Sequence, residues 1–239
     1  MNILITGATS GIGRQLAEDY LQEGHQVWAV GRNEQILKEL AEKGMHTGRI
    51  DLSHRQESLE WFATLNSIDL AILNAGTCEY IDMPDFDSSI VQRVMRANVE
   101  SMAISIEGVL PLLKKSANPH LAGVGSSAAY LPLPRAEAYG SSKAAVAYML
   151  ETLRLTLRPD GIVVSLISPG FVQTPLTDLN DFPMPFRISV QEASRAIRQG
   201  LARKKAEVHF PKKFTWLMKA AAFLPRPVWT KLAQKMVNS

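Results

Sequence analysis

Cysteine is almost missing from this 239-residue chain, as are the usual signals of metal binding and export. Cys78 is the only cysteine, which excludes an internal disulfide and a cysteine-based zinc site and fits a reducing compartment. The five histidines are scattered, with no ligand spacing such as HExxH, so we expect no metal. The N-terminus lacks the parts of a signal peptide, and no run approaches the roughly 18 apolar residues of a membrane span. We therefore expect a soluble, cytoplasmic protein.

Positive and negative charges are also nearly balanced in this chain. The formal net charge is +3 and 46% of the residues are hydrophobic. Such a mild charge does not indicate nucleic-acid binding unless it is concentrated in one place. The hydrophobic content argues against disorder, and a chain of this length can bury a large core without disulfides.

Short apolar runs alternate with segments of helical spacing along the chain. The predicted strands cover residues 2–6, 26–30, 47–50, 70–73, 122–125, 162–167 and 207–210. The predicted helices cover residues 12–23, 34–43, 56–65, 88–115, 138–157 and 191–203, and a proline-rich loop covers 169–185. Apolar strands between helices indicate a parallel sheet covered on both faces. We predict an α/β fold, a doubly wound Rossmann-type parallel sheet of about seven strands with helices on both faces. Its active site would lie outside the carboxyl ends of the strands.

A glycine-rich turn follows the first predicted strand directly. Residues 6–13 read TGATSGIG and lead into a helix. Glycines let the backbone bend and let a pyrophosphate approach closely, and a helix N-terminus supplies free amides and partial positive charge. A plain glycine-rich turn is the alternative. A P-loop is disfavoured because the segment contains no Gly-Lys-Ser/Thr.

The end of the second predicted strand bears on the choice of coenzyme. An acidic residue here would bind the ribose 2′-hydroxyl of NAD. This chain has Gly31 at that position, followed by Arg32. A guanidinium suits a 2′-phosphate by charge and by forked geometry, so we predict NADP(H). The alternative is that Arg32 is a solvated loop residue.

A tyrosine and a lysine lie four residues apart near the start of a long predicted helix. Tyr139 and Lys143 would share one helix face. Tyrosine has a pKa near 10, and a nearby ammonium together with an oxidised nicotinamide would lower it toward neutrality. A YxxxK pair alone is common by chance, and an ordinary surface pair is the alternative.

Taken together, the TGxxxGIG turn, the YxxxK pair and a strand-terminal serine closely resemble the short-chain dehydrogenase/reductase family over about residues 1–210. The resemblance implies that Ser126, thirteen positions before Tyr139, polarises a substrate carbonyl. Ser127 is the neighbouring alternative, with a turn hydrogen bond as its expected role. Asn98 matches the fourth catalytic position of the family, where it holds a water that links Lys143 to solvent. A solvent-facing helix residue is the alternative for Asn98.

Further segments match the cofactor-binding positions of the family. Asp51 would contact the adenine, or alternatively serve as a helix cap or turn residue. Asn74-Ala75-Gly76 matches the family's NAG motif, with Leu73 in place of a more common Asn. Residues 169–174 resemble its PGxVxT segment, for which a simple Pro-Gly turn is the alternative. The predicted cofactor-binding residues are Gly7, Thr9, Ser10, Gly11, Ile12, Gly13, Arg32, Asp51, Leu52, Asn74, Ala75, Gly76, Tyr139, Lys143, Pro169, Gly170, Val172 and Thr174.

These residues predict an NADP(H)-dependent oxidoreductase that interconverts a carbonyl and an alcohol, with Tyr139 as general acid and base. One domain over residues 1–239 would carry both functions, with 211–239 as a helical extension. We expect a hydrophobic ketone, aldehyde or alcohol as substrate, and residues 175–185 as a mobile lid. The side chains expected to face the substrate are those of Cys78, Tyr80, Tyr130, Leu131, Phe171, Leu176, Leu179 and Phe182. Packing in the core is the alternative for several of them.

The tail after Phe210 mixes Trp, Leu, Met and Lys in two segments separated by Pro225-Arg226-Pro227. We predict two short basic amphipathic helices. They could attach to an anionic membrane surface or, as we favour, dock on the body or another subunit. The resemblance implies a homo-oligomer paired through the long helices, and we expect no nucleic-acid partner. A non-catalytic NADP(H)-binding regulator and a membrane or nucleic-acid adaptor are the rival functions.

Overall fold

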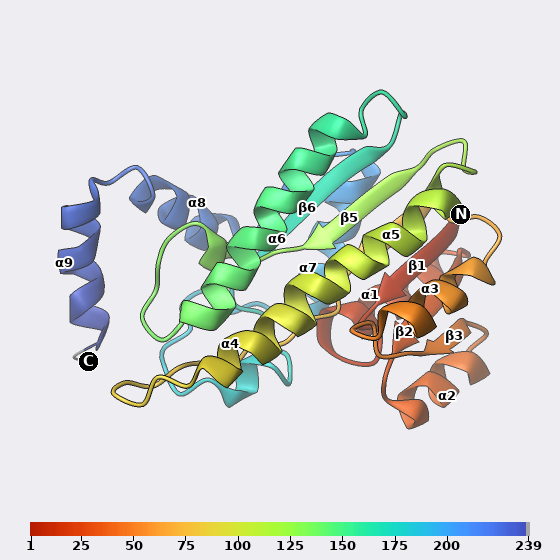
Figure 1. Ribbon diagram of the computed structural model, residues 1–239. Helices are drawn as coiled ribbons and strands as arrows, with labels where there is room; N and C mark the ends of the chain where they lie inside the picture. Colours follow the sequence, from red (N-terminus) through yellow and green to blue (C-terminus); the bar gives the residue numbers. More distant parts are fainter. Residues whose placement is uncertain (238–239) are drawn as a thin grey trace.

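The centre of the molecule is a seven-stranded parallel sheet in the order β3-β2-β1-β4-β5-β6-β7 (Figure 1). The computed structural model describes residues 1–237, with the side chains of Leu179 and of residues 235–237 outside that description. The strands are β1 (Asn2–Thr6), β2 (Gln26–Gly31), β3 (His46–Arg49), β4 (Leu70–Leu73), β5 (His120–Val124), β6 (Val163–Pro169) and β7 (Glu207–Phe210). Every residue of β4 and β5 is buried, because helices cover both faces of the sheet. The predicted doubly wound architecture is confirmed.

Helices form a layer on each face of the sheet and enclose two apolar cores. On one face lie α1 (Gly11–Gln22), α2 (Glu34–Glu42) and α7 (Val190–Ala202), which bury Leu16, Leu40 and Ile197 against the strands. On the other face lie α3 (Arg55–Ala63), α5 (Ser101–Leu113) and α6 (Glu137–Thr156). The strand order reverses between β1 and β4, so a crevice opens at the carboxyl ends of these strands.

The long helix predicted over residues 88–115 is not continuous. It consists of α4 (Ser88–Met95), a π-helical turn η1 (Arg96–Glu100) and α5. A π-helical turn holds one extra residue and is frequent at functional sites. The turn directs Asn98 inward, where its side chain is 1% exposed. The alternative of a solvent-facing Asn98 is therefore wrong.

The two helices predicted in the tail are present as α8 (Lys212–Ala221) and α9 (Arg226–Val237). α8 follows the edge strand β7 and pairs with it through Lys219 and Glu207. Figure 1 shows α9 at the periphery of the molecule. Phe214 and Met218 of α8 pack with Leu131, and Phe171 lies against the same cluster. Among the described residues, no helix is both long and apolar enough to cross a membrane.

Candidate active site

One cavity of about 910 Å³ lies at the carboxyl ends of β1, β2, β4, β5 and β6. This volume is in the upper range of ligand pockets. Of the predicted catalytic and cofactor-binding residues, all but Gly13 and Asn98 line it in the described structure. Segments from six different parts of the chain thus meet at one place, although the role of each residue stays a prediction.

The glycine turn between β1 and α1 adopts a backbone that larger residues would resist. Gly7 has a φ of +65°, in the left-handed region that glycine tolerates best. Gly13 sits so close to the turn that a Cβ would come 2.3 Å from the Gly7 carbonyl oxygen, so its role is packing within the turn. Ser10 caps α1 without a side-chain hydrogen bond. The first amides of the helix therefore face the cavity as donors for an anion.

Asn74 ties the end of β4 to this glycine turn. Its backbone N–H donates to the Thr6 hydroxyl at 2.9 Å, and its side-chain amide donates to the carbonyls of Thr6 (3.2 Å) and Gly7 (3.3 Å). Leu73, which stands where the related family often has Asn, is buried in the sheet. Leu73 therefore packs in the core and does not line the cavity.

Arg32 and Asp51 lie together at the β2 end of the cavity. The Arg32 guanidinium is 78% exposed and its Nη1 lies 3.6 Å from an Asp51 carboxylate oxygen. Partial burial raises the pKa of Asp51, but hydrogen bonds from Ser53 and the charge of Arg32 outweigh this, so its pKa is lowered. Asp51 accepts bonds from both the amide and the hydroxyl of Ser53, which gives it the predicted turn role as well as a place on the cavity wall.

Gly31, beside Arg32, has no room for a side chain. A Cβ there would come 2.6 Å from Cγ2 of Thr9 and 3.0 Å from its hydroxyl oxygen. The side chain of Thr9 thus fills the position that an acidic residue at the end of β2 would use. The charged groups at this end of the cavity are therefore Arg32 and Asp51.

Tyr139, Lys143 and Ser126 converge on the part of the cavity next to β5. The Lys143 ammonium is buried, donates to the Val124 carbonyl at 3.0 Å and lies 5.8 Å from the centre of the Tyr139 ring. Desolvation lowers the pKa of Lys143 to about 8. The Ser126 hydroxyl oxygen accepts the Ala128 N–H at 3.1 Å, so its own proton remains free to donate toward the cavity.

The phenol of Tyr139 has a raised pKa. Burial and the nearby Cys78 thiol raise it above its ordinary value, and a hydrogen bond from Ser126 opposes them. The lowering predicted from the Lys143 ammonium together with an oxidised nicotinamide stays a prediction.

Ser126, not Ser127, makes the turn hydrogen bond after β5. Ser126 caps the short helical turn η2 (Ser127–Ala129) and lines the cavity. Ser127 is buried and contributes its backbone carbonyl to the Tyr130 amide at 3.1 Å. The turn role expected for Ser127 thus belongs to Ser126.

Asn98 connects the loop after β4 to α6 through hydrogen bonds to Thr77 and Ser142. Its amide nitrogen donates to the Thr77 carbonyl and the Ser142 hydroxyl, both at 2.9 Å, and its oxygen accepts the Thr77 N–H at 2.7 Å. A Cβ on Gly76 would lie 2.9 Å from the Asn98 oxygen and 3.5 Å from the Lys143 nitrogen, so these two side chains face the same spot. Both amide hydrogens of Asn98 are used within the protein, and the predicted water role stays a prediction.

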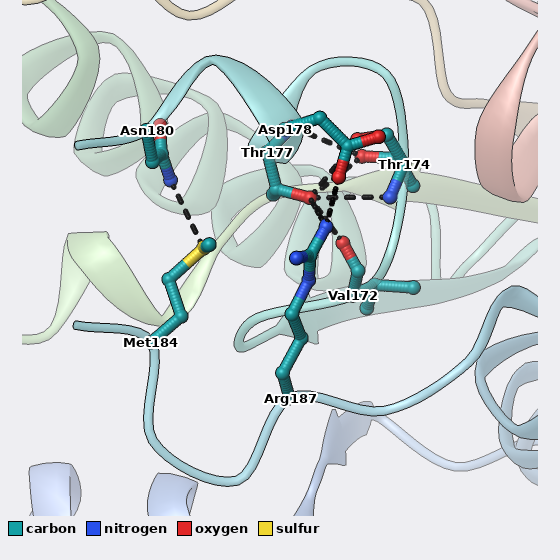
Figure 2. A network of polar contacts seen from close by, with 7 residues as sticks. All are labelled: Val172, Thr174, Thr177, Asp178, Asn180, Met184 and Arg187. Carbon is teal, nitrogen blue, oxygen red and sulfur yellow. Dashed lines mark hydrogen bonds and ion pairs between the residues drawn. The ribbon is translucent and has the colours of Figure 1, made fainter. Parts of the chain in front are cut away.

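A polar cluster closes the loop after β6 (Figure 2). The Thr177 hydroxyl donates to the Val172 carbonyl at 2.5 Å and accepts the Thr174 N–H at 3.1 Å. Arg187 donates to the same hydroxyl at 3.1 Å and pairs with Asp178. Val172 and Thr174 thereby keep their places on the cavity wall. Sequence reasoning missed Thr177 and Arg187, whose partners lie within an irregular loop.

Arg135, also missed, joins three loops around the cavity. It donates to Asp82 and to Asp181, each at 2.6 Å, and lies 5.5 Å from the centre of the Tyr80 ring. Asp82 follows β4, Arg135 precedes α6, and Asp181 belongs to the predicted lid. Arg135 thus clamps the lid to the body of the protein.

The expected substrate wall is only partly present. Leu176 lines the cavity. Tyr130 turns toward Glu207, and Leu131 and Phe171 pack against α8, as the core-packing alternative holds. The other expected side chains include Tyr80 and Phe182, which make an edge contact at 5.5 Å, and the half-buried Cys78, whose pKa burial raises. Leu179 lies outside the described side chains.

Comparison with known proteins matches most of this chain to one family. A family model described as short chain dehydrogenase matches residues 1–181. The chain belongs to the short-chain dehydrogenase/reductase family of oxidoreductases. An uncharacterized oxidoreductase of Myxococcus xanthus is 32% identical, over 98% of this chain and 96% of that protein.

Two further members of the short-chain dehydrogenase/reductase family carry more specific descriptions. An NADP-dependent 3-hydroxy acid dehydrogenase of Escherichia coli is 29% identical, over 72% of this chain and 73% of that protein. The solved structure of a short chain dehydrogenase from Burkholderia cenocepacia in complex with NADP is 25% identical, with a TM-score of 0.86, over 97% of this chain and 96% of that one. The fold and a nucleotide cofactor are therefore features of the family to which this chain belongs.

Proposed function

We propose that this protein is an NADP(H)-dependent reductase and dehydrogenase that interconverts a carbonyl and an alcohol. The observation that carries the proposal is the convergence of Ser126, Tyr139 and Lys143 in the cavity that the glycine turn also lines. The alternative of an ordinary surface pair does not account for Lys143, because this lysine is buried and not on the surface. Burying a cation is costly, and such groups are common at functional sites.

The cavity fits a pyridine dinucleotide at both ends. At one end the glycine turn and the uncapped N-terminus of α1 suit a pyrophosphate. At the β2 end, Arg32 supplies a cation and Gly31 leaves no room for the acid that would select NAD. NADP(H) is therefore the coenzyme we propose. When bound, it supplies the hydride.

The protein's own groups provide the proton and the polarisation. Ser126 keeps its own proton and donates a hydrogen bond to the substrate carbonyl oxygen, which withdraws electron density from the carbon. Tyr139 then protonates the oxygen of the developing alkoxide, and takes the proton back in the reverse direction. The raised pKa of the Tyr139 phenol suits the role of proton donor in reduction. Lys143 supplies positive charge beside the phenol and restores its proton.

The substrate class we propose is a small or apolar ketone, aldehyde or alcohol. Leu176 of the predicted lid gives the cavity an apolar lining, and Phe182 of the same segment contacts Tyr80. Hydroxy acids belong in the same test, because the Escherichia coli relative is named for them. We also infer a homo-oligomer, since Tyr148 and Leu155 of α6 are exposed large side chains on a long helix.

A panel of ketones, aldehydes, alcohols and 3-hydroxy acids tests the proposal with NADPH, NADH and their oxidised forms. Absorbance of the reduced nicotinamide reports turnover, and quenching of tryptophan fluorescence reports binding. We expect turnover with the phosphorylated coenzyme. Tight NADPH binding with no turnover on any substrate would favour the non-catalytic regulator, and rejection of both coenzymes would overturn the proposal.

A further inference from the structure

The last 37 residues differ sharply in charge from the rest of the chain. Residues 203–239 contain nine lysines and arginines and a single acid, Glu207, whereas residues 1–202 contain 17 basic and 22 acidic residues. The mild net charge therefore conceals a strongly basic C-terminal end on an acidic body. Concentrated charge of this kind selects partners of opposite sign.

The orientation of α8 is fixed by contacts on its inner side. Phe214, Thr215 and Met218 are buried against the body of the protein. Lys219 pairs with Glu207 of β7, and the Thr215 hydroxyl lies 2.7 Å from the ring nitrogen of His209. The predicted docking on the body is thus observed for α8. These contacts determine which side chains face outward.

The outer side of the tail is apolar as well. Trp216 is 60% exposed, Leu217 62% and Phe223 90%. Val228 and Leu232 of α9 are also exposed. We call this region the tail surface; it consists of Trp216, Leu217, Phe223, Leu224, Val228 and Leu232 with the exposed cations Lys212, Lys213, Arg226 and Lys231. Exposed large apolar side chains on two consecutive helices, interspersed with cations, make this part of the chain a candidate binding surface.

We propose that the tail surface docks on an anionic lipid bilayer. Exposed aromatic and aliphatic side chains beside lysines suit the headgroup boundary of such a membrane, where each basic residue adds attraction to acidic lipids. A second copy of the chain is a poorer fit for this face, because pairing two tail surfaces would oppose like charges. A nucleic acid would match the cations and stack on Trp216 or Phe223, but offers little to Leu217, Leu224 and Leu232.

Flotation of the full chain with lipid vesicles tests the proposal. We expect binding to vesicles of equal parts phosphatidylcholine and phosphatidylglycerol, little binding to phosphatidylcholine alone, and release by salt. Lys212→Gln with Lys213→Gln should weaken partitioning at least about tenfold, because each cation contributes roughly fivefold. Leu217→Ser with Phe223→Ser should weaken it about tenfold through lost apolar burial.

Matched control variants distinguish binding through the tail surface from nonspecific binding to vesicles. Lys114→Gln with Lys115→Gln removes two exposed cations from the end of α5, and Leu155→Ser removes an exposed leucine from α6. Both should bind vesicles as the unaltered protein does. Substitutions are preferable to deleting the tail, because deletion would uncover Leu131 and Phe171.

Several results would overturn the proposal. They are equal binding to neutral and anionic vesicles, binding to neither, or full binding by the tail variants. A dimer in light scattering that the tail variants abolish, without vesicle binding, would assign the surface to a second copy. Salt-sensitive retention of an oligonucleotide without vesicle binding would assign it to nucleic acid. No arm depends on turnover, so the proposed enzyme activity stands or falls separately.

Discussion

The two sides of the cavity are built by different means. On the side of β1, β2 and β4, backbone groups do most of the work: the glycine turn, the amides of α1 and the Asn74 bonds to Thr6 and Gly7. On the lid side, separate loops are held by side-chain pairs such as Arg135 with Asp82 and Asp181. The family match ends at residue 181, inside that loop. Local backbone requirements thus determine the side of β1, β2 and β4, whereas the lid side depends on contacts between exposed residues that are distant in sequence.

Removing the phenol should have the largest effect. Tyr139→Phe takes away the proposed proton donor while keeping the ring, so turnover should fall by roughly a hundredfold to ten-thousandfold. Coenzyme affinity should change little, because the glycine turn is untouched. Steady-state rates with NADPH and a titration of tryptophan fluorescence would measure the two quantities. Turnover near that of the unaltered enzyme would rule out the mechanism.

The buried charge of Lys143 should be measurable as stability. Its pKa of about 8 lies below the 10.5 of an exposed lysine, so the charged form is disfavoured in the folded state at neutral pH. This penalty, up to about 3 kcal/mol, diminishes as the pH rises from about 8 toward 10.5, where the folded protein has already released the proton. Lys143→Met removes the charge and also the bond to Val124, worth about 1 kcal/mol.

We therefore expect Lys143→Met to be more stable than the unaltered protein by about 2 kcal/mol at pH 7. The difference should shrink as the pH approaches 10. Urea unfolding of the coenzyme-free protein at both pH values measures it, with Lys115→Met as the exposed control. A difference independent of pH would mean that the ammonium is not desolvated.

The cation at the β2 end should set coenzyme choice by a smaller factor. Arg32→Asp replaces the partner of a 2′-phosphate with a carboxylate, so the ratio of kcat/KM for NADPH over NADH should fall by at least about tenfold. Arg49→Asp, at the exposed end of β3, is a control of equal charge change. Unaltered selectivity in Arg32→Asp would refute the assignment of Arg32.

The ion pairs of Arg135 with Asp82 and Asp181 should have the smallest effect on the kinetic constants. Arg135→Gln removes two exposed ion pairs, which contribute roughly 0–1 kcal/mol each, so KM for the substrate should rise a few-fold with kcat nearly unchanged. Lys114→Gln breaks the exposed pair with Asp160, neither residue of which lines the cavity, and should leave KM unaltered. A large loss of kcat in Arg135→Gln would mean that Arg135 affects the chemical step and not only the binding of substrate.

Much of the cofactor side could be predicted because its requirements are local. TGATSGIG and YxxxK carry their geometry in adjacent residues, and the strand pattern brings them together. Asn98 was anticipated by resemblance, but its burial depends on the π-helical turn, which no periodicity revealed. The raised pKa that Tyr139 has in the protein itself could not be predicted from the sequence, because desolvation depends on packing from several elements at once.

The lid side and the substrate wall could not be predicted to the same degree. Tyr130, Leu131 and Phe171 are apolar or aromatic, and nothing in their neighbours along the chain indicates that α8 covers them. Arg135 meets Asp82 and Asp181 across 53 and 46 residues of sequence. Contacts between residues so far apart in the sequence leave no local pattern. The sequence therefore predicts the coenzyme more directly than the substrate class.

The close approach of Thr9 to Gly31 constrains how a protein with the proposed NADP(H) preference could change to NAD(H). A carboxylate introduced at position 31 alone would collide with Thr9, whose branched side chain cannot swing far aside. A smaller residue at position 9 would have to come first. The two positions are thus coupled, and an evolutionary or engineered route toward NAD has a preferred order of steps.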